Sequence, residues 1–258
     1  MIVTFDKDIL TAAVTPAMSA VSNKNTITSI EGICITAEAD GTCILNSFDL
    51  EKGIRCTVRG RVEEPGSYII NGQKLNQIIR FMPGDIRIEV GENMRARISS
   101  GKSEFTINAM PGDEFPNTPA LEGDWGFSMP QCELRDAMVK TLYAVAVNEP
   151  RPALNGIFFK ISGNKLTLVS SDSFRLAVCE KEFGIENSIG DGALDVAIIV
   201  PGKTAGELLK MLEDSTAPVS VCATSKHIIF KMENLCFFSR LIYLAAAGSI
   251  CSTWDLVP

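Results

Sequence analysis

The chain has only one histidine, His227, among its 258 residues, and this scarcity limits the chemistry it can perform. A zinc-peptidase motif or a His₂-carboxylate iron site needs two histidines, and a Ser-His-Asp triad could form only around His227. That residue lies in the apolar run SKHIIFKM, with no cysteine or carboxylate at ligand spacing. We therefore expect a surface or edge histidine, with no catalytic residue and no metal site.

The sequence also has no excess of basic residues over acidic ones. The sequence has 24 Lys and Arg against 31 Asp and Glu, which gives a formal net charge of -7. This balance argues against a protein that a globally basic surface holds on nucleic acid, because such binding depends on neutralising phosphates. Local basic stripes remain compatible with it.

Paired cysteines and long apolar runs are missing as well. The eight cysteines are scattered singly with no C-x-x-C pair, and most lie in apolar, strand-like runs, so we expect reduced core thiols. The N-terminus MIVTFDKDIL has acidic residues where a signal peptide needs a basic segment, and no stretch approaches the ~20 apolar residues of a membrane span. The sequence predicts a cytoplasmic protein without membrane contact.

The first half of the chain alternates between helical and strand periodicity. Apolar residues recur every three or four positions from Ile9 to Val21, which predicts a helix over roughly residues 6–22. Two β-prone runs joined at Asp40-Gly41 predict a hairpin. YIINGQKLNQIIRFM then predicts a second helix, and three alternating runs predict a β-meander.

The same order of elements recurs in the second half, which indicates an internal duplication. SMPQCELRDAMVKTLYAVA and VPGKTAGELLKML are helical, and strand-like runs follow each. Leu10 aligns with Leu134 at an offset of 124, and Asp49 with Asp172 at 123. We expect an α+β fold with domains at residues 1–125 and 126–242, each with two helices side by side on antiparallel sheet.

One local motif invites a nucleotide-binding interpretation. A strand runs into a helix through Val200-Pro201-Gly202-Lys203-Thr204, as in a phosphate-binding loop. The loop needs another glycine five residues before Gly202, where this chain has Ala197, and Pro201 removes a backbone donor. We expect no nucleotide at this turn and no cofactor elsewhere.

Basic residues accompany all four predicted helices. Solvated helix faces ordinarily carry such residues, and the third helix also has Glu133 and Asp136, so charge alone is weak evidence. In a duplicated α+β unit, however, the helices would share one face, which suits loose, sequence-independent phosphate contacts. The candidate DNA-binding residues are Lys24, Lys74, Arg80, Arg135, Lys140, Lys203 and Lys210.

The second half resembles a known family. RPALNGIFFKISGNKLTLVSSDSFRLAVCEKEF (151–183) is similar to the second-domain signature of the bacterial DNA polymerase III beta subunit, or sliding clamp. AIIVPGKTAGELLKML, MPGDEFPN and FSRLI resemble further clamp segments, and the resemblance covers residues 1 to about 242. It implies duplicated DNA-clamp domains in a ring around duplex DNA. The implied function is a non-catalytic processivity factor for the replicative DNA polymerase, on which the clamp loader and repair proteins also dock.

The resemblance also implies two sets of site residues. Lys24, Lys74, Arg80, Lys203 and Lys210 match the clamp's channel positions, where weak, water-bridged phosphate contacts would permit sliding. One wall of the clamp's pocket for short hydrophobic peptides is matched by Leu154, Ser171, Ser173, Phe174, Arg175 and Leu176. Plain core packing is the alternative for Leu154 and Leu176, and Phe174 stands where the family often has histidine or another polar residue.

The C-terminus departs from the family pattern. After FSRLI the family continues into a third domain, whereas here an uncharged stretch leads to CSTWDLVP. We expect an atypical tail over residues 243–258, loss of the family's dimer joint and of the pocket's other wall, and weaker partner binding. Self-association could take another form, for instance three chains that give six domains.

Two functions other than a sliding clamp are also compatible with the sequence. A phosphohydrolase could use carboxylates such as Asp49 and Asp172, although their equivalence across the duplication favours a turn role, since a catalytic pair would converge. A peptide-binding scaffold that never encircles DNA is the other. Metal-dependent turnover would indicate the phosphohydrolase. Partner binding that depends on Leu176 but not on Lys74 or Arg80 would indicate the peptide-binding scaffold.

Overall fold

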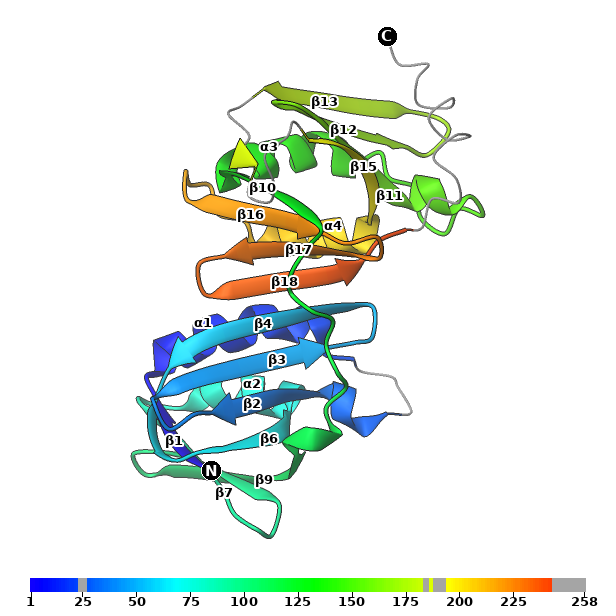
Figure 1. The fold of residues 1–258 in the computed structure, drawn as a ribbon. Helices are drawn as coiled ribbons and strands as arrows, with labels where there is room; N and C mark the ends of the chain where they lie inside the picture. Colours follow the sequence, from blue (N-terminus) through cyan, green and yellow to red (C-terminus); the bar gives the residue numbers. More distant parts are fainter. Residues whose placement is uncertain (23–26, 183–185, 188–193, 243–258) are drawn as a thin grey trace. The chain divides into compact units, whose positions relative to one another are not determined.

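The computed structural model describes residues 1–22, 27–182, 186–187 and 194–242 (Figure 1). The chain divides into two compact units. The first comprises Met1–Ala120 with Lys231–Phe238, and the second comprises Leu121–Phe230 with Ser239–Pro258. The predicted tail at 243–258 lies outside the described residues.

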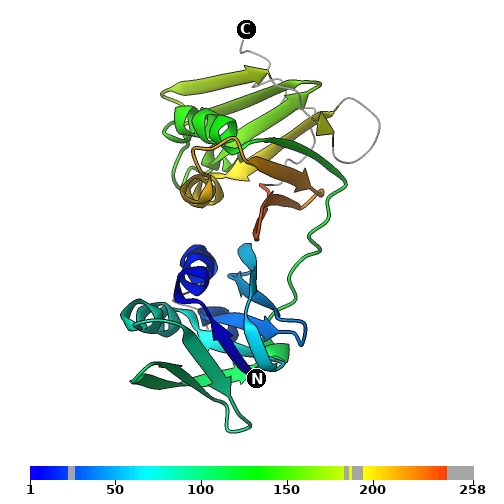
Figure 2. The same cartoon turned by 90° about the vertical axis from the view of Figure 1, so that its left-hand side faces the viewer.

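The N-terminal half is antiparallel sheet with two helices. Its elements are β1 (Ile2–Phe5), α1 (Lys7–Ala17), β2 (Gly32–Ala37), β3 (Thr42–Phe48), β4 (Lys52–Arg59), β5 (Arg61–Glu64), β6 (Gly66–Asn71), α2 (Gly72–Phe81), β7 (Ile86–Val90), β8 (Arg95–Ser100) and β9 (Ser103–Pro111). The strand order is β4-β3-β2-β6-β9-β8-β7-β1-β5. The two helices contact each other and lie side by side, as predicted (Figure 2).

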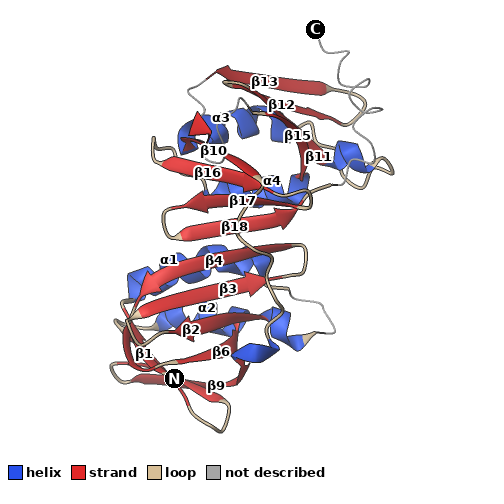
Figure 3. Ribbon diagram, in the orientation of Figure 1, coloured by secondary structure: helices blue, strands red, loops and turns tan. Residues whose placement is uncertain are grey.

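The C-terminal half repeats this plan. Its elements are β10 (Trp125–Pro130), α3 (Gln131–Leu142), β11 (Gly156–Ser162), β12 (Lys165–Ser171), β13 (Leu176–Glu182), β14 (Glu186–Asn187), β15 (Asp195–Pro201), α4 (Gly202–Met211), β16 (Pro218–Ala223), β17 (His227–Met232) and β18 (Leu235–Arg240). The strand orders are β14-β10-β16-β17-β18 and β13-β12-β11-β15. Helices α3 and α4 contact each other, and α3 also packs against β12 and β13 (Figure 3).

Helix boundaries follow local chemistry. The Asp6 side chain accepts hydrogen bonds from the backbone N–H groups of Asp8 and Ile9, so α1 begins at Lys7. The helix changes to a 3₁₀ turn at Met18, and Val21 is extended, so the predicted end at residue 22 was too late. The first helix therefore covers about three turns rather than nearly five.

Two predicted helices began too early. The run YIINGQKLNQIIRFM opens with strand β6, and α2 begins only at Gly72, where the Asn71 Oδ1 accepts from the Lys74 N–H at 3.0 Å. Likewise the run from Ser128 opens with the end of β10. In both cases a strand leads directly into a helix, so periodicity over a long window merged the two elements.

The duplication extends to individual packing contacts. A Cβ added to Gly72 would lie 2.9 Å from Val21 Cγ2, and one added to Gly202 would lie 2.7 Å from Val145 Cγ1. Both glycines open the second helix of their half, and both valines follow the first helix. The same close approach in both halves confirms the repeat and explains Gly202 as a packing residue.

Candidate nucleic-acid interface and peptide-docking site

Helix α2 presents the clearest basic surface. Its buried side consists of Leu75, Ile78 and Ile79, and this stripe leaves Lys74 and Arg80 exposed. No acidic residue occurs between Gly72 and Phe81, and neither cation has an ion pair with a described residue. Both side chains are therefore available to phosphates.

The cations of α3 and α4 are more constrained. Lys140 donates to Asp136 at 2.8 Å and Lys210 donates to Glu207 at 3.0 Å, each within its own helix. Arg135 is partly buried and Lys203 is exposed, and neither makes an ion pair with a described residue. Lys24 lies outside the described residues. That the four helices share one face of the molecule stays a prediction.

The turn between β12 and β13 is fixed by its own polar groups. Asp172 Oδ1 accepts from the N–H groups of Phe174 at 3.1 Å and Arg175 at 3.0 Å. Ser171 Oγ donates to the Arg175 carbonyl at 2.9 Å and accepts from the Ser173 N–H at 3.1 Å. The bond from Phe174 is the largest cause that holds the pKa of Asp172 below its usual value. These bonds hold the Phe174 side chain out in solvent, 96% exposed.

The loop after α3 is tied to this turn. The Arg151 guanidinium donates to Ser173 Oγ at 2.6 Å, and the Arg175 guanidinium lies 5.4 Å from the centre of the Tyr143 ring. The carbonyl of Leu154 accepts from the Ala146 N–H at 3.0 Å. The structure thus brings the loop and turn together. Sequence reasoning missed Arg151 and Tyr143 as site residues, because nothing in their local pattern indicates contacts to a turn over 20 residues away.

An apolar surface continues from the turn across the outer face of the sheet. Leu176 and Val178 point to the same face because strand side chains alternate, and they are 50% and 40% exposed. Val178 pairs with Val169, Val169 with Phe158, and Phe158 with Ile199, so an apolar row crosses all four strands. We call the exposed Leu176 and Val178, together with the buried Val169, Phe158 and Ile199 that continue the row, the apolar shelf. Against it pack Ala153 and Ile242.

The exposed fractions of Leu154 and Leu176 bear on whether each leucine belongs to a docking site or to the core. Leu176 is half exposed, so plain core packing does not account for it, whereas Leu154 is only partly exposed. Helix α3, the loop after it and the segment from the turn into β13 carry six exposed large apolar side chains. They are Val139, Tyr143, Val147, Phe174, Leu176 and Val178. Such a concentration is typical of a docking surface.

The repeat supplies an internal comparison. Asp49 Oδ1 accepts from the N–H groups of Glu51 and Lys52, the same two-bond cap that Asp172 makes in the other half. The residue after each aspartate has a positive φ, 76° at Leu50 and 75° at Ser173. The two carboxylates are therefore matching turn caps. In the first half, however, Glu51 and Gly53 occupy the places of Phe174 and Leu176, and the exposed apolar residue is Leu50, in the place of Ser173.

Other candidate chemistry receives no support from the geometry. No group of three or more His, Cys, Asp or Glu side chains could hold a metal within the described residues. The pKa of His227 is lowered mainly by burial, and its imidazole makes no ion pair with a carboxylate of the described residues. Within that same part of the chain, seven cysteines form no disulfide, and no helix has the length and apolar character to cross a membrane.

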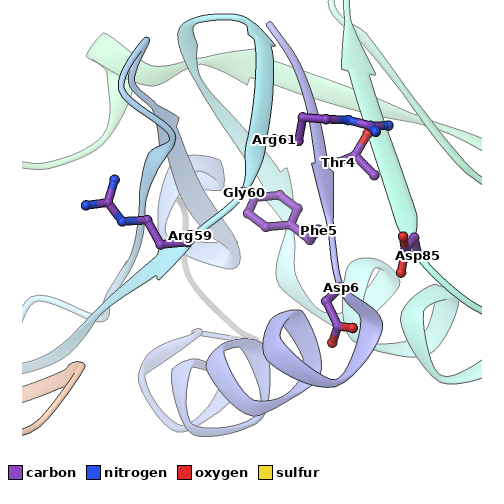
Figure 4. Close-up of a pocket in the computed structure, with 7 residues that line it drawn as sticks. All are labelled: Thr4, Phe5, Asp6, Arg59, Gly60, Arg61 and Asp85. Atoms are coloured by element: carbon purple, nitrogen blue, oxygen red, sulfur yellow. The ribbon is translucent and has the colours of Figure 1, made fainter.

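One shallow pocket of about 260 Å³ lies at the start of α1 (Figure 4). Two of its four charged residues have structural roles. Asp6 caps α1, and Arg59 donates to the Asp40 carbonyl and to Thr42 Oγ1, both at 3.1 Å. The lining consists of Thr4, Phe5, Asp6, Arg59, Gly60, Arg61 and Asp85. We assign it no function.

Comparison with known proteins covers nearly the whole chain. Two protein-family models match the chain. The model of the DNA polymerase III beta subunit, N-terminal domain, matches residues 1–119, and the model of the central domain of the same subunit matches residues 128–244. The beta sliding clamp of Halalkalibacterium halodurans is 33% identical over 98% of this chain, and that of Bacillus subtilis is 31% identical over 99%. The chain spans 67% of the length of each relative.

Solved structures give the same result. The sliding clamp of Bacillus subtilis superposes with a TM-score of 0.90 at 30% identity, covering 100% of this chain and 68% of that one. A sliding clamp from Pseudomonas aeruginosa bound to griselimycin gives 0.89 at 25% identity, with the same coverage. The repeated fold and its helix pairs define the class as a DNA clamp of duplicated domains. The chain belongs to the DNA polymerase III beta subunit family of sliding clamps. Clamps of this family are processivity factors and not enzymes, and the chain shares that role.

Proposed function

We propose that this chain tethers the replicative DNA polymerase to duplex DNA, with helix-borne cations that contact phosphates without reading sequence. The exposed, uncompensated Lys74 and Arg80 of α2 support this proposal most directly, because α2 carries no acidic residue. Arg135 and Lys203 add two cations without an ion pair to a described residue. Such contacts are strong enough to steer DNA and weak enough to permit sliding.

The proposal includes a second surface for protein partners. The polymerase, the clamp loader and repair proteins would each dock a short hydrophobic peptide on the apolar shelf beside Leu154, Ser171, Ser173, Phe174, Arg175 and Leu176. The observation that carries this step is the contrast between the two turns, since the same backbone carries Phe174 and Leu176 in one half and Glu51 and Gly53 in the other. Cytoplasmic location and self-association into a closed ring belong to the same proposal.

A substitution at the shelf tests partner docking. Leu176→Ala removes a half-exposed apolar side chain, and we expect at least a tenfold loss of binding to the replicative polymerase of the same organism, measured by surface plasmon resonance. Leu50→Ala is the matched control, because Leu50 is 38% exposed and lies in the equivalent turn of the first half. Equal polymerase affinity for both variants and the unmodified chain would contradict the assignment of this surface.

The rival scaffold function gives a different pattern. Charge reversal at Lys74 and Arg80 would then leave every activity intact, while Leu176→Ala still abolished partner binding. The clamp proposal instead requires that Lys74→Glu with Arg80→Glu weakens association with DNA. Fluorescence anisotropy of a labelled linear duplex at low salt separates the two functions.

A further inference from the structure

The four helices differ in how their cations are compensated. Helix α2 contains two cations and no acid, whereas α4 contains Lys203, Lys210 and Glu207. Helix α3 balances two cations, Arg135 and Lys140, with Glu133 and Asp136. The candidate DNA-binding residues therefore fall into available and already paired groups.

The paired group is held by short contacts. Lys140 Nζ lies 2.8 Å from Asp136 Oδ2, and Lys210 Nζ lies 3.0 Å from Glu207 Oε1. Asp136 also accepts from Lys181 of β13 at 2.8 Å, and Lys181 contacts Glu133 at the same distance. Hydrogen bonds from Lys140 and then Lys181 hold the pKa of Asp136 below its usual value, so this carboxylate is ionised at neutral pH.

These ion pairs compete with phosphate without excluding it. The Lys140 and Lys210 side chains are 55% and 71% exposed, and exposed ion pairs are weak and screened by salt. A DNA phosphate must nevertheless displace the carboxylate before it can contact the lysine ammonium group. Each paired lysine should therefore contribute less to DNA binding than an unpaired one at the same distance.

We propose that Asp136 and Glu207 are positioning residues that restrain Lys140 and Lys210 from binding DNA phosphates. This inference rests on the proposed function, because it concerns the same DNA-facing helices. The four helices would then contribute unequally to DNA binding. Helix α2 supplies the persistent contacts, while α3 and α4 exchange their lysines between carboxylate and phosphate, which keeps resistance to sliding low.

Glu207→Gln is the sharpest test. Among the residues that the structure describes, Glu207 pairs with Lys210 alone, so the change frees one cation without disturbing a larger network. The measurement is fluorescence anisotropy of a labelled linear duplex between 50 and 200 mM salt. One additional phosphate contact adds up to about 0.9 to the slope of log affinity against log salt, which is a roughly 3.5-fold greater loss of affinity over that range. We expect tighter binding at 50 mM and a steeper slope.

Glu180→Gln is the matched control. Glu180 also pairs with a lysine, Lys165 at 2.8 Å, but both residues lie on strands β12 and β13. The variant removes the same unit of charge, so any effect of net charge alone appears there too. Asp136→Asn is the second test variant, with thermal unfolding measured in parallel because Asp136 also contacts Lys181.

The outcomes separate the inference from the proposed function. If the unmodified chain binds the duplex and the Glu207→Gln and Asp136→Asn slopes equal that of Glu180→Gln, the restraint is absent and the clamp function stands. If the unmodified chain shows no salt-dependent binding to DNA, the proposed function itself fails. A steeper slope in both test variants but not in the control supports the restraint.

Discussion

Single residues define the turns that carry the candidate docking site. Asp172 accepts two backbone N–H groups and an Arg175 side-chain bond at 3.0 Å, and its equivalent Asp49 makes the same backbone cap. The sequence predicted a turn role for this pair from their offset alone. It could not predict that Arg151 and Tyr143 contact the turn, because those contacts depend on how the loop after α3 folds back.

Asp172→Ala is expected to destabilise the chain in a pH-dependent way. The folded-state pKa of Asp172 is lowered, so its contribution is fully present above the unfolded pKa of about 3.9 and is lost as pH falls through the lower, folded value. The melting temperature of the variant should thus lie below that of the unmodified chain at pH 7, and the difference should shrink below about pH 4. Circular dichroism melts at both pH values measure this, and a difference that grows in acid would contradict the ionised cap.

At the scale of secondary-structure elements, the sequence predicted the helices more completely than the strands. Amphipathic stripes located all four helices, since Leu75, Ile78 and Ile79 form a single buried side on α2. The prediction omitted β4, β5 and β6 of the first half. It also omitted β1 and β10, because each leads within a residue or two into a helix. Alternation over four to six residues is too brief to be separated from the helical stripe that follows.

Two glycines of α4 should respond oppositely to alanine. A Cβ at Gly202 would lie 2.7 Å from Val145 Cγ1 and 3.3 Å from the Asn155 carbonyl oxygen, so Gly202→Ala should lower stability. A Cβ at Gly206 meets nothing within 4 Å, and alanine in a helix interior gains roughly 0.5–1 kcal/mol over glycine. Urea denaturation of both variants tests this. Stabilisation by Gly202→Ala would show that the close packing at the start of α4 is not a constraint.

At the scale of the whole molecule, the duplication is the feature that the sequence showed best. The offset between Asp49 and Asp172 corresponds in the structure to identical caps, and Gly72 and Gly202 make equivalent close approaches to Val21 and Val145. What periodicity could not supply is the placement of helix-borne cations around DNA, because that depends on how domains assemble. The resemblance to sliding clamps implied it, and it remains a proposal.

The central claim is that encirclement retains the chain on DNA, while weak phosphate contacts let it slide. Its most direct test is retention of the chain on a nicked circular plasmid, after loading by the clamp loader, during gel filtration at a salt concentration that screens phosphate contacts. We expect the chain to remain with the circle and to be released once the plasmid is linearised. Equal loss from circular and linear DNA would contradict encirclement and leave only a peptide-docking role.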